Sequence, residues 1–293
     1  MYTAKWGVAT DTGRRRDHNE DSHYIDPEAG LFVISDGMGG HQAGEVASAL
    51  AVKTIADAVL AGHSLKKSVA LAHDAILNAS KKGPGVRGMG ATAVALLLKG
   101  SLYEIAWVGD SRGYLWDSSK GELRQITRDH SLVQQMLDSG TLKPEEARNH
   151  PKGNVVTQAL GVINMPELTV DTVTGKLSAG QQLLLCSDGL TGELDDSEIA
   201  DHLRKKGTIQ EIAERLVDSA NSRGGKDNIT LILVPASPES SSISKSDETL
   251  SMEAKALNQH AVNGKKSNVR KIALAALIAG TLLLVMAVVR WVL

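Results

Sequence analysis

The sequence predicts an α+β fold: a four-layer α-β-β-α sandwich of two antiparallel sheets flanked by helix pairs. Two observations lead to this fold class. Strand-like apolar runs follow one another through short turns, which favours antiparallel pairing. Helical patterns occur in adjacent pairs, and not as single crossovers between parallel strands. Two sheets packed face to face, each covered by one helix pair, satisfy both observations.

The expected strands are short runs of aliphatic and β-branched residues. They are Trp6–Thr10, Leu31–Ser35, Ala91–Leu98, Leu102–Val108, Gly113–Trp116, Leu168–Val173, Leu183–Cys186 and Ile229–Val234. The connections at Gly100 and Ser101 and at 117–122 are too short for a helical crossover, so their strands should pair antiparallel.

The expected helices form two pairs. In the first pair, apolar residues recur at helical spacing from Val52 to Leu60 and again from Val69 to Leu77. The second pair covers about Ser197–Lys205 and Ile209–Asn221. Its second helix begins with a capping box, in which Thr208 is followed three residues later by Glu211. Each pair can therefore cover one sheet.

The chain of 293 residues divides into three segments by composition. Residues 1–235 hold all the strand and helix patterns and form one expected folded domain. Residues 236–268 are rich in serine and small polar residues, which indicates a flexible linker. Residues 269–293 contain an apolar run from Ile272 to Val289 without a charge, long enough for a transmembrane helix through a ~30 Å hydrocarbon core.

The flanks of this apolar run predict its orientation. Lys265, Lys266, Arg270 and Lys271 precede the run and only Arg290 follows it. Because basic flanks stay in the cytoplasm, we expect a single-pass anchor in the inner (cytoplasmic) membrane with residues 1–235 inside the cell. A buried core helix is the less favoured alternative.

Composition excludes some functions. The formal net charge is -2 and aromatic residues make up 3%, so neither a basic groove nor stacking platforms for nucleic acid are expected. The single cysteine, Cys186, cannot form an internal disulfide, and its apolar setting indicates a small buried residue.

Acidic residues recur at the ends of expected strands. Asp36, Asp110 and Asp188 each follow an apolar run, and Asp227 stands just before one. Singly, each could be a turn or cap residue. Together, converging carboxylates would repel one another unless cations or protons bridged them, and hard oxygen ligands favour magnesium or manganese.

The segment 13–22, "GRRRDHNEDS", adds a cation to these acids. Arg16 lies four and five residues before Glu20 and Asp21. The same loop could therefore offer a guanidinium fork for phosphate and carboxylates for metal-bound waters. A solvated charged loop is the alternative.

These motifs resemble the metal-dependent serine/threonine protein phosphatases of the PPM or type 2C family in its bacterial form. The matching segments are "RDHNED" (16–21), "VISDGMGGH" (33–41), "GMGATAVALLL" (88–98), "VGDSRGYL" (108–115), "TRDHSLVQQMLDSG" (127–140), "HPKGNVVTQALG" (150–161), "LLLCSDGL" (183–190) and "GGKDNITLILV" (224–234). Their order and spacing follow the family and cover most of the chain.

The resemblance implies a site that binds two or three Mn2+ or Mg2+ ions. Asp36 would bridge two metals, the Gly37 carbonyl would bind one of them, and Asp188 and Asp227 would complete the first site. Glu20 and Asp21 would act on the second metal through its waters. Asp110, together with Asp188, would hold a third metal.

The resemblance also implies the chemistry. Hydroxide bridging the two metals would attack phosphoserine or phosphothreonine directly, without a phosphoenzyme. Arg16 would bind the substrate phosphate, Asn228 would support the loop that carries Asp227, and residues from about Ser131 to Val156 would form a mobile flap. Phosphorylated proteins would be the substrates, and the enzyme would oppose a serine/threonine kinase.

One position departs from many members of the family. They carry a histidine proton donor after the Asp-Gly, whereas this chain has Met38, which has no proton to give. The donor would then be a water on the third metal or His41. His130 is expected to be structural. Because Asp36, Asp188 and Asp227 are all present, an active phosphatase is favoured over a catalytically silent phosphoprotein-binding scaffold.

Overall fold

The computed structural model describes residues 5–39, 43–81, 88–148, 150–162 and 168–236. All of them belong to one compact unit that spans residues 1–240. The expected transmembrane segment, all but the first residue of the expected linker, and His41 lie outside the described residues. In the part of the chain that is described, no helix is both long and apolar enough to cross a bilayer.

The strands form two antiparallel sheets, as predicted. The first sheet has the order β1-β11-β10-β7-β8, made of β1 (Gly7–Asp11), β11 (Ile229–Pro235), β10 (Gln181–Cys186), β7 (Arg112–Asp117) and β8 (Glu122–Gln125). The second has the order β2-β3-β5-β6-β9, made of β2 (Asp21–Asp26), β3 (Leu31–Met38), β5 (Ala93–Lys99), β6 (Leu102–Val108) and β9 (Asp171–Lys176). A two-residue strand, β4 (Gly90–Ala91), pairs with the end of β3.

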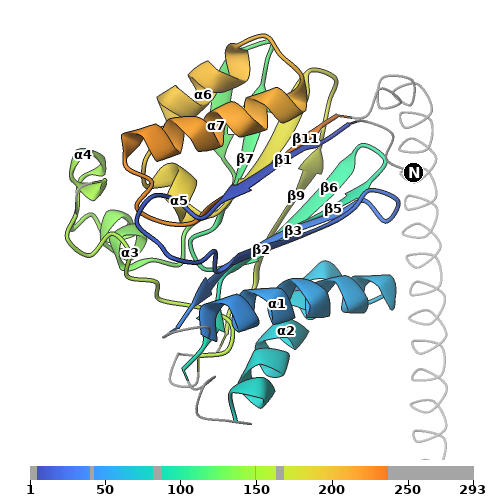
Figure 1. Cartoon of the computed structure of the whole chain (residues 1–293). Coiled ribbons are helices and arrows are strands. Elements are labelled where there is room, and N and C mark those ends of the chain that lie inside the picture. The colour runs from blue at the N-terminus through green and yellow to red at the C-terminus, as the bar shows by residue number, and fades with distance from the viewer. Residues whose placement is uncertain (1–4, 40–42, 82–87, 149, 163–167, 237–293) are drawn as a thin grey trace, which may run out of the picture. The chain divides into compact units, whose positions relative to one another are not determined.

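Helices cover the outer face of each sheet (Figure 1). In that view α6 and α7 lie above the β1-β11-β7 side, and α1 and α2 lie below β2 and β3. The helices are α1 (Ala43–Leu60), α2 (Leu65–Ser80), α3 (Leu132–Asp138), α4 (Pro144–Ala147), α5 (Asp188–Thr191), α6 (Asp196–Arg204) and α7 (Ile209–Arg223). The α-β-β-α sandwich predicted from sequence is therefore the observed architecture.

Side-chain alternation along β3 explains the layers. Leu31 and Val33 pack in the core under α1 and α2, whereas Phe32 and Ile34 pack between the two sheets. Successive strand residues point to opposite faces, so a strand with apolar residues on both faces must be covered on both. In β11, Leu231 likewise packs toward α7 and Ile232 toward the other sheet.

The strand boundaries differ from the sequence prediction in ways that matter for the site. The third strand continues beyond Ser35 to Met38, because Asp36 pairs with Asp21 of β2 and Gly37 pairs with Ala91 of β4. The strand expected at Leu168–Val173 begins instead at Asp171, since Val170 is buried against the first helix pair. Neither β2 nor β8 was predicted, because most of their residues are polar.

Candidate metal centre

Asp36 lies inside a paired strand and not in a turn. Its N–H donates to Thr92 Oγ1 at 3.0 Å, and its carbonyl accepts from the Thr92 N–H at 2.8 Å. The Gly37 N–H donates to the Glu20 carbonyl at 3.2 Å. A Cβ on Gly37 would lie 2.1 Å from the Gly44 carbonyl oxygen at the start of α1, so only glycine fits there. The backbone around Asp36 is held from several sides.

Asp21 faces Asp36 across the β2-β3 pair and contacts the other sheet. Ser187 Oγ donates to Asp21 Oδ2 at 2.8 Å, and the Thr230 N–H donates to the same hydroxyl at 3.0 Å. Ser187 follows β10 and Thr230 lies in β11. The two sheets therefore meet at Asp21, so the acids of one sheet lie next to the acids of the other.

Asp188 and Asp227 come from the first sheet. Asp188 is the first residue of α5, directly after Ser187, and Asp227 directly precedes Asn228 and β11. Asp36 and Asp188 lie close enough across the sheets for each carboxyl group to shift the pKa of the other. Three of the predicted metal ligands are therefore drawn from both sheets to one edge.

Asp110 lies where the chain crosses from β6 in one sheet to β7 in the other. It is buried, with 8% of its surface exposed. The preceding Gly109 has φ of 103°, and a Cβ there would lie 2.6 Å from the Thr92 methyl group, so this crossing requires glycine. Arg112, two residues on, forms a bidentate pair with Asp129, in which Nε donates to Oδ1 and Nη2 donates to Oδ2.

The carboxyl cluster is electrostatically strained. Burial raises the pKa of Asp21 to about 7, against hydrogen bonds from Thr230 and Ser187 that lower it. Burial and the charge of Asp188 raise the pKa of Asp110 to about 8. Burial and the neighbouring carboxylates raise the pKa of Asp36 well above its usual value, and burial and Asp227 raise that of Asp188. Each carboxylate would be stabilised by a cation at this edge.

Arg16 contacts this cluster directly. Its Nη2 lies 2.7 Å from Asp227 Oδ2, and this hydrogen bond raises the pKa of the guanidinium. Half of the side chain is exposed. The fork carries five N–H donors and this ion pair uses one of them, so the guanidinium can also face an anion from solvent.

Asn228 holds the loop that carries Arg16 and Glu20. Its Nδ2 donates to the Thr12 and His18 carbonyls, each at 2.9 Å, and its Oδ1 accepts from the Glu20 N–H at 2.7 Å. The sequence predicted support for the loop of Asp227. In the structure the Asn228 side chain braces the neighbouring loop, 12–20, and the Asn228 N–H donates to Asp227 Oδ1 at 2.9 Å. The Glu20 carboxylate lies beside Gly44, where a Cβ would meet it at 2.6 Å.

The donor set fits a hard divalent cation. All its side-chain donors are carboxylate oxygens, and two of them, Asp21 Oδ1 and Asp188 Oδ1, are buried without a hydrogen-bond partner. Among the described residues, no group of three or more His, Cys, Asp or Glu side chains stands as a ready-made metal site. The Arg16–Asp227 ion pair is a contact that metal ligation by Asp227 would replace.

The segment predicted as a flap forms α3 and α4. Its base is closed by a bridge between Ser131 and Val156 and by the Thr157 N–H, which donates to the His130 carbonyl at 2.7 Å. The His130 ring accepts from the Gly109 N–H through Nδ1, and its Nε2 lies 3.1 Å from Asp171. His130 is therefore structural, as expected. Met38 ends β3 beside Gly90.

Sequence reasoning missed several residues that support the site. Ser187 and Thr230 join the two sheets at Asp21, and Thr92 fixes the backbone of Asp36. The motifs containing these residues were recognised, but a hydroxyl beside an acid is common, and the sequence does not show which hydroxyl faces which carboxylate. Cys186, in contrast, is buried as predicted, and burial raises the pKa of its thiol to about 12.

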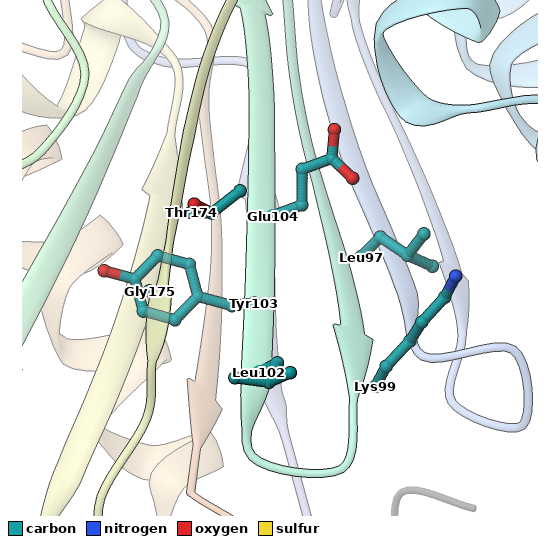
Figure 2. Close-up of a pocket in the computed structure, with 7 residues that line it drawn as sticks. All are labelled: Leu97, Lys99, Leu102, Tyr103, Glu104, Thr174 and Gly175. Carbon is teal, nitrogen blue, oxygen red and sulfur yellow. The ribbon is translucent and has the colours of Figure 1, made fainter. Parts of the chain in front are cut away.

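A separate pocket of about 360 Å³ lies at the other end of β5 and β6. Figure 2 shows its lining, which is Leu97, Lys99, Leu102, Tyr103, Glu104, Thr174 and Gly175. Strands rise about 3.3 Å per residue, so this end of a seven-residue strand lies roughly 20 Å from the Asp36 end. The pocket is thus no part of the carboxylate site.

Comparison with known proteins defines the class. The model of the family described as protein phosphatase 2C matches residues 11–233, which include every predicted metal ligand. The chain therefore belongs to the protein phosphatase 2C family, whose members are metal-dependent protein serine/threonine phosphatases.

Two of the similar proteins are phosphatases from bacteria. The serine/threonine phosphatase stp of Listeria monocytogenes is 41% identical over 238 residues, which cover 77% of this chain and 93% of that protein. The phosphatase PstP of Mycobacterium tuberculosis is 39% identical, over 78% of this chain but only 44% of its own length.

Solved structures of similar proteins share the fold. The crystal structure of the M. tuberculosis phosphatase PstP/Ppp superposes with a TM-score of 0.72 at 36% identity, covering 80% of this chain and 98% of that one. A structure of the PstP catalytic domain in complex with two manganese ions superposes with a TM-score of 0.70 at 34% identity, covering 79% of this chain and 97% of that one.

Proposed function

We propose that this chain hydrolyses phosphoserine and phosphothreonine on proteins by direct attack of water, without a phosphoenzyme, and so opposes a serine/threonine kinase. The observation that carries the proposal is the cluster of carboxyl groups that both sheets bring to one edge, with raised pKa values and two unpartnered carboxylate oxygens. Such a cluster is matched to multivalent cations.

Two observations support the assignment of the metals: the oxygen ligands that this chain offers and the metal content of a related structure. Asp36, Asp188 and Asp227, with the Gly37 carbonyl, would hold two Mn2+ or Mg2+ ions, and the related PstP domain is known with two manganese ions. Asp110 would add a third ion. Bound in this place, such ions would supply the activated water and the positive charge that phosphoryl transfer requires.

Side chains of this chain would bind the substrate phosphate and orient the waters around the metals. Arg16 is half exposed beside Asp227, so its guanidinium can bind the substrate phosphate from the solvent side. Glu20 and Asp21 would accept hydrogen bonds from waters around the metals. Asn228 keeps the Arg16 loop against the start of β11 and thereby sets the distance between phosphate binding and the metal ligands.

Phosphate release from peptides tests the proposal. The full-length chain should release phosphate from phosphothreonine and phosphoserine peptides with Mn2+, release none in EDTA, and recover when Mn2+ is restored. A phosphotyrosine peptide of the same sequence serves as the matched substrate control. Activity that survives EDTA would contradict the metal mechanism. An inactive chain that binds the phosphopeptide tightly would instead identify a scaffold.

We also propose that residues 272–289 anchor the chain in the inner membrane, with the catalytic domain in the cytoplasm. The support is the uncharged apolar run and the excess of basic residues on its N-terminal side. Fractionation of cells that express the full-length chain should recover it with the membranes, and a chain ending at residue 268 should be released. Recovery of the full-length chain in the soluble fraction would contradict the anchor.

A further inference from the structure

Glu193 is a buried carboxylate that the proposed mechanism does not use. It follows α5, the short helix that begins with Asp188, and only 5% of its side chain is exposed. Its Oε1 accepts from the backbone N–H of Lys226 at 3.1 Å and lies 3.7 Å from Lys226 Nζ. The residue after Lys226 is the metal-ligand candidate Asp227.

The loop 224–227 has little room around this carboxylate. A Cβ on Gly224 would lie 3.3 Å from Glu193 Oε1, and Gly224 has φ of 152° at the end of α7. On its other side the loop is held by the Gly225 carbonyl, which accepts from the N–H groups of Arg14 and Arg15. Glu193 is thus the side chain that fixes the loop from the α5 side, one residue before Asp227.

The flap reaches the same turn through Arg148. This residue caps the C-terminal end of α4. Its Nη2 donates to the Glu193 carbonyl at 3.1 Å, and its Nη1 lies 3.3 Å from Asp195 Oδ2. The Arg148 guanidinium therefore contacts the turn between α5 and α6 at two points. The same turn carries Glu193, whose carboxylate binds the loop that contains Asp227.

We propose that Glu193 is a positioning residue for the metal-ligand loop 224–227, and that Arg148 couples the flap to that loop through Glu193. This inference rests on the proposed function. Because a buried carboxylate with two partners has a defined orientation, it can fix the backbone before Asp227. A shift of the flap would then move the Glu193 backbone and change how well Asp227 is placed for a cation.

The positioning role of Glu193 is tested by calorimetric measurement of the Mn2+ affinity of the full-length chain. Glu193→Ala should raise the Kd for Mn2+ about tenfold, as is typical when a group that orients a metal ligand is lost. Glu193→Gln keeps an oxygen acceptor for the Lys226 N–H and should stay within about threefold of the unaltered chain. The KM for a phosphothreonine peptide, measured at saturating Mn2+, should change less than the Kd for Mn2+ does.

Ser64→Ala is the matched control, because it removes the N-cap of α2 in the other helix layer and costs about 1 kcal/mol of stability. It should leave Mn2+ affinity unchanged. If Glu193→Ala binds Mn2+ like the unaltered chain, or if Ser64→Ala weakens binding equally, the positioning role is refuted. If the unaltered chain itself binds no Mn2+, the proposed function fails, and the inference with it.

Substitution of Arg148 tests the coupling between the flap and the loop 224–227. Because its side chain is about half exposed, the variant should still fold. Arg148→Ala should raise the Kd for Mn2+ by about threefold in the native background and should have no further effect when combined with Glu193→Ala. Equal effects of Arg148→Ala in both backgrounds would show that the flap does not act through Glu193.

Discussion

At the residue scale, the acids of this chain are placed where their charge is least tolerated. Asp21, Asp36, Asp110 and Asp188 come from both sheets and from the crossing between them, and burial raises the pKa of each. No packing requirement explains four carboxyls at one edge. A cation that replaces their protons would stabilise all four groups as carboxylates, which accounts for their being placed together.

The pH dependence of the stability should therefore differ between the metal-free and the metal-bound chain. The pKa of Asp21 is raised to about 7 and that of Asp110 to about 8, so the folded chain binds more protons than the unfolded chain between about pH 4 and pH 8. This stabilisation is complete below pH 4 and is lost as the pH rises through the folded-state values. In EDTA we expect Tm to fall from pH 5 to pH 8.

Excess Mn2+ should oppose that fall, because ligation requires deprotonated carboxylates and so strengthens with pH. Thermal unfolding followed by circular dichroism, at each pH with EDTA or Mn2+, measures both curves. Parallel curves in the two conditions would mean that the raised carboxyls are not the metal ligands.

Arg16 should separate phosphate binding from metal binding. We expect Arg16→Ala to lower kcat/KM for a phosphothreonine peptide by roughly 10- to 100-fold, since hydrogen bonds to charged groups contribute ~1.5–3 kcal/mol. The Kd for Mn2+ should stay constant or fall, because the variant frees Asp227 from its ion pair. Steady-state kinetics and calorimetry on the same sample check this, and weaker Mn2+ binding would contradict it.

At the element scale, β3 determines both the packing and the site. Its residues alternate between the helix-covered core and the core between the sheets, and its last residues pair with β2 and β4 to hold Asp36. The apolar part of this strand was predictable because four consecutive apolar residues are typical of a strand covered on both faces. Its continuation through Asp36 and Gly37 was not, because Asp-Gly is also typical of a turn.

Two substitutions compare a buried position between the sheets with an exposed position at the end of a strand. Phe32 is fully buried between the sheets, so Phe32→Ala should lower the free energy of unfolding by about 3–5 kcal/mol. Leu102 is 60% exposed at the β5-β6 turn, so Leu102→Ala should cost well under 1 kcal/mol. Urea unfolding of both variants measures the difference, and similar costs would contradict the proposed core.

Helix starts were also readable from the sequence. Thr208 and Glu211 form the predicted capping box, with Thr208 Oγ1 accepting from the Glu211 N–H and the Glu211 carboxylate accepting from the Thr208 N–H. In contrast, α3 and α4 in the flap span only seven and four residues, so they leave little apolar periodicity to detect.

At the scale of the whole molecule, the sequence could predict the layers and the acids but not how the two sheets meet. The convergence of Asp21 and Asp188 depends on Ser187 and Thr230, which join the sheets through hydroxyl and backbone groups. Glu193 and Arg148 lay inside or beside recognised motifs, but their partners are far away in sequence. Such long-range pairs leave no local pattern.

The most direct test of the two-metal phosphatase site compares two isosteric substitutions in the full-length chain. Asp36→Asn changes the proposed bridging ligand, and Asp26→Asn changes an aspartate whose Oδ1 accepts from the turn N–H groups of Glu28 and Ala29 at the far end of β2. Phosphate release from a phosphothreonine peptide is measured at saturating Mn2+. The proposed mechanism predicts that Asp36→Asn loses at least about 100-fold in kcat while Asp26→Asn keeps the activity of the unaltered chain. Near-normal kcat in Asp36→Asn would contradict it.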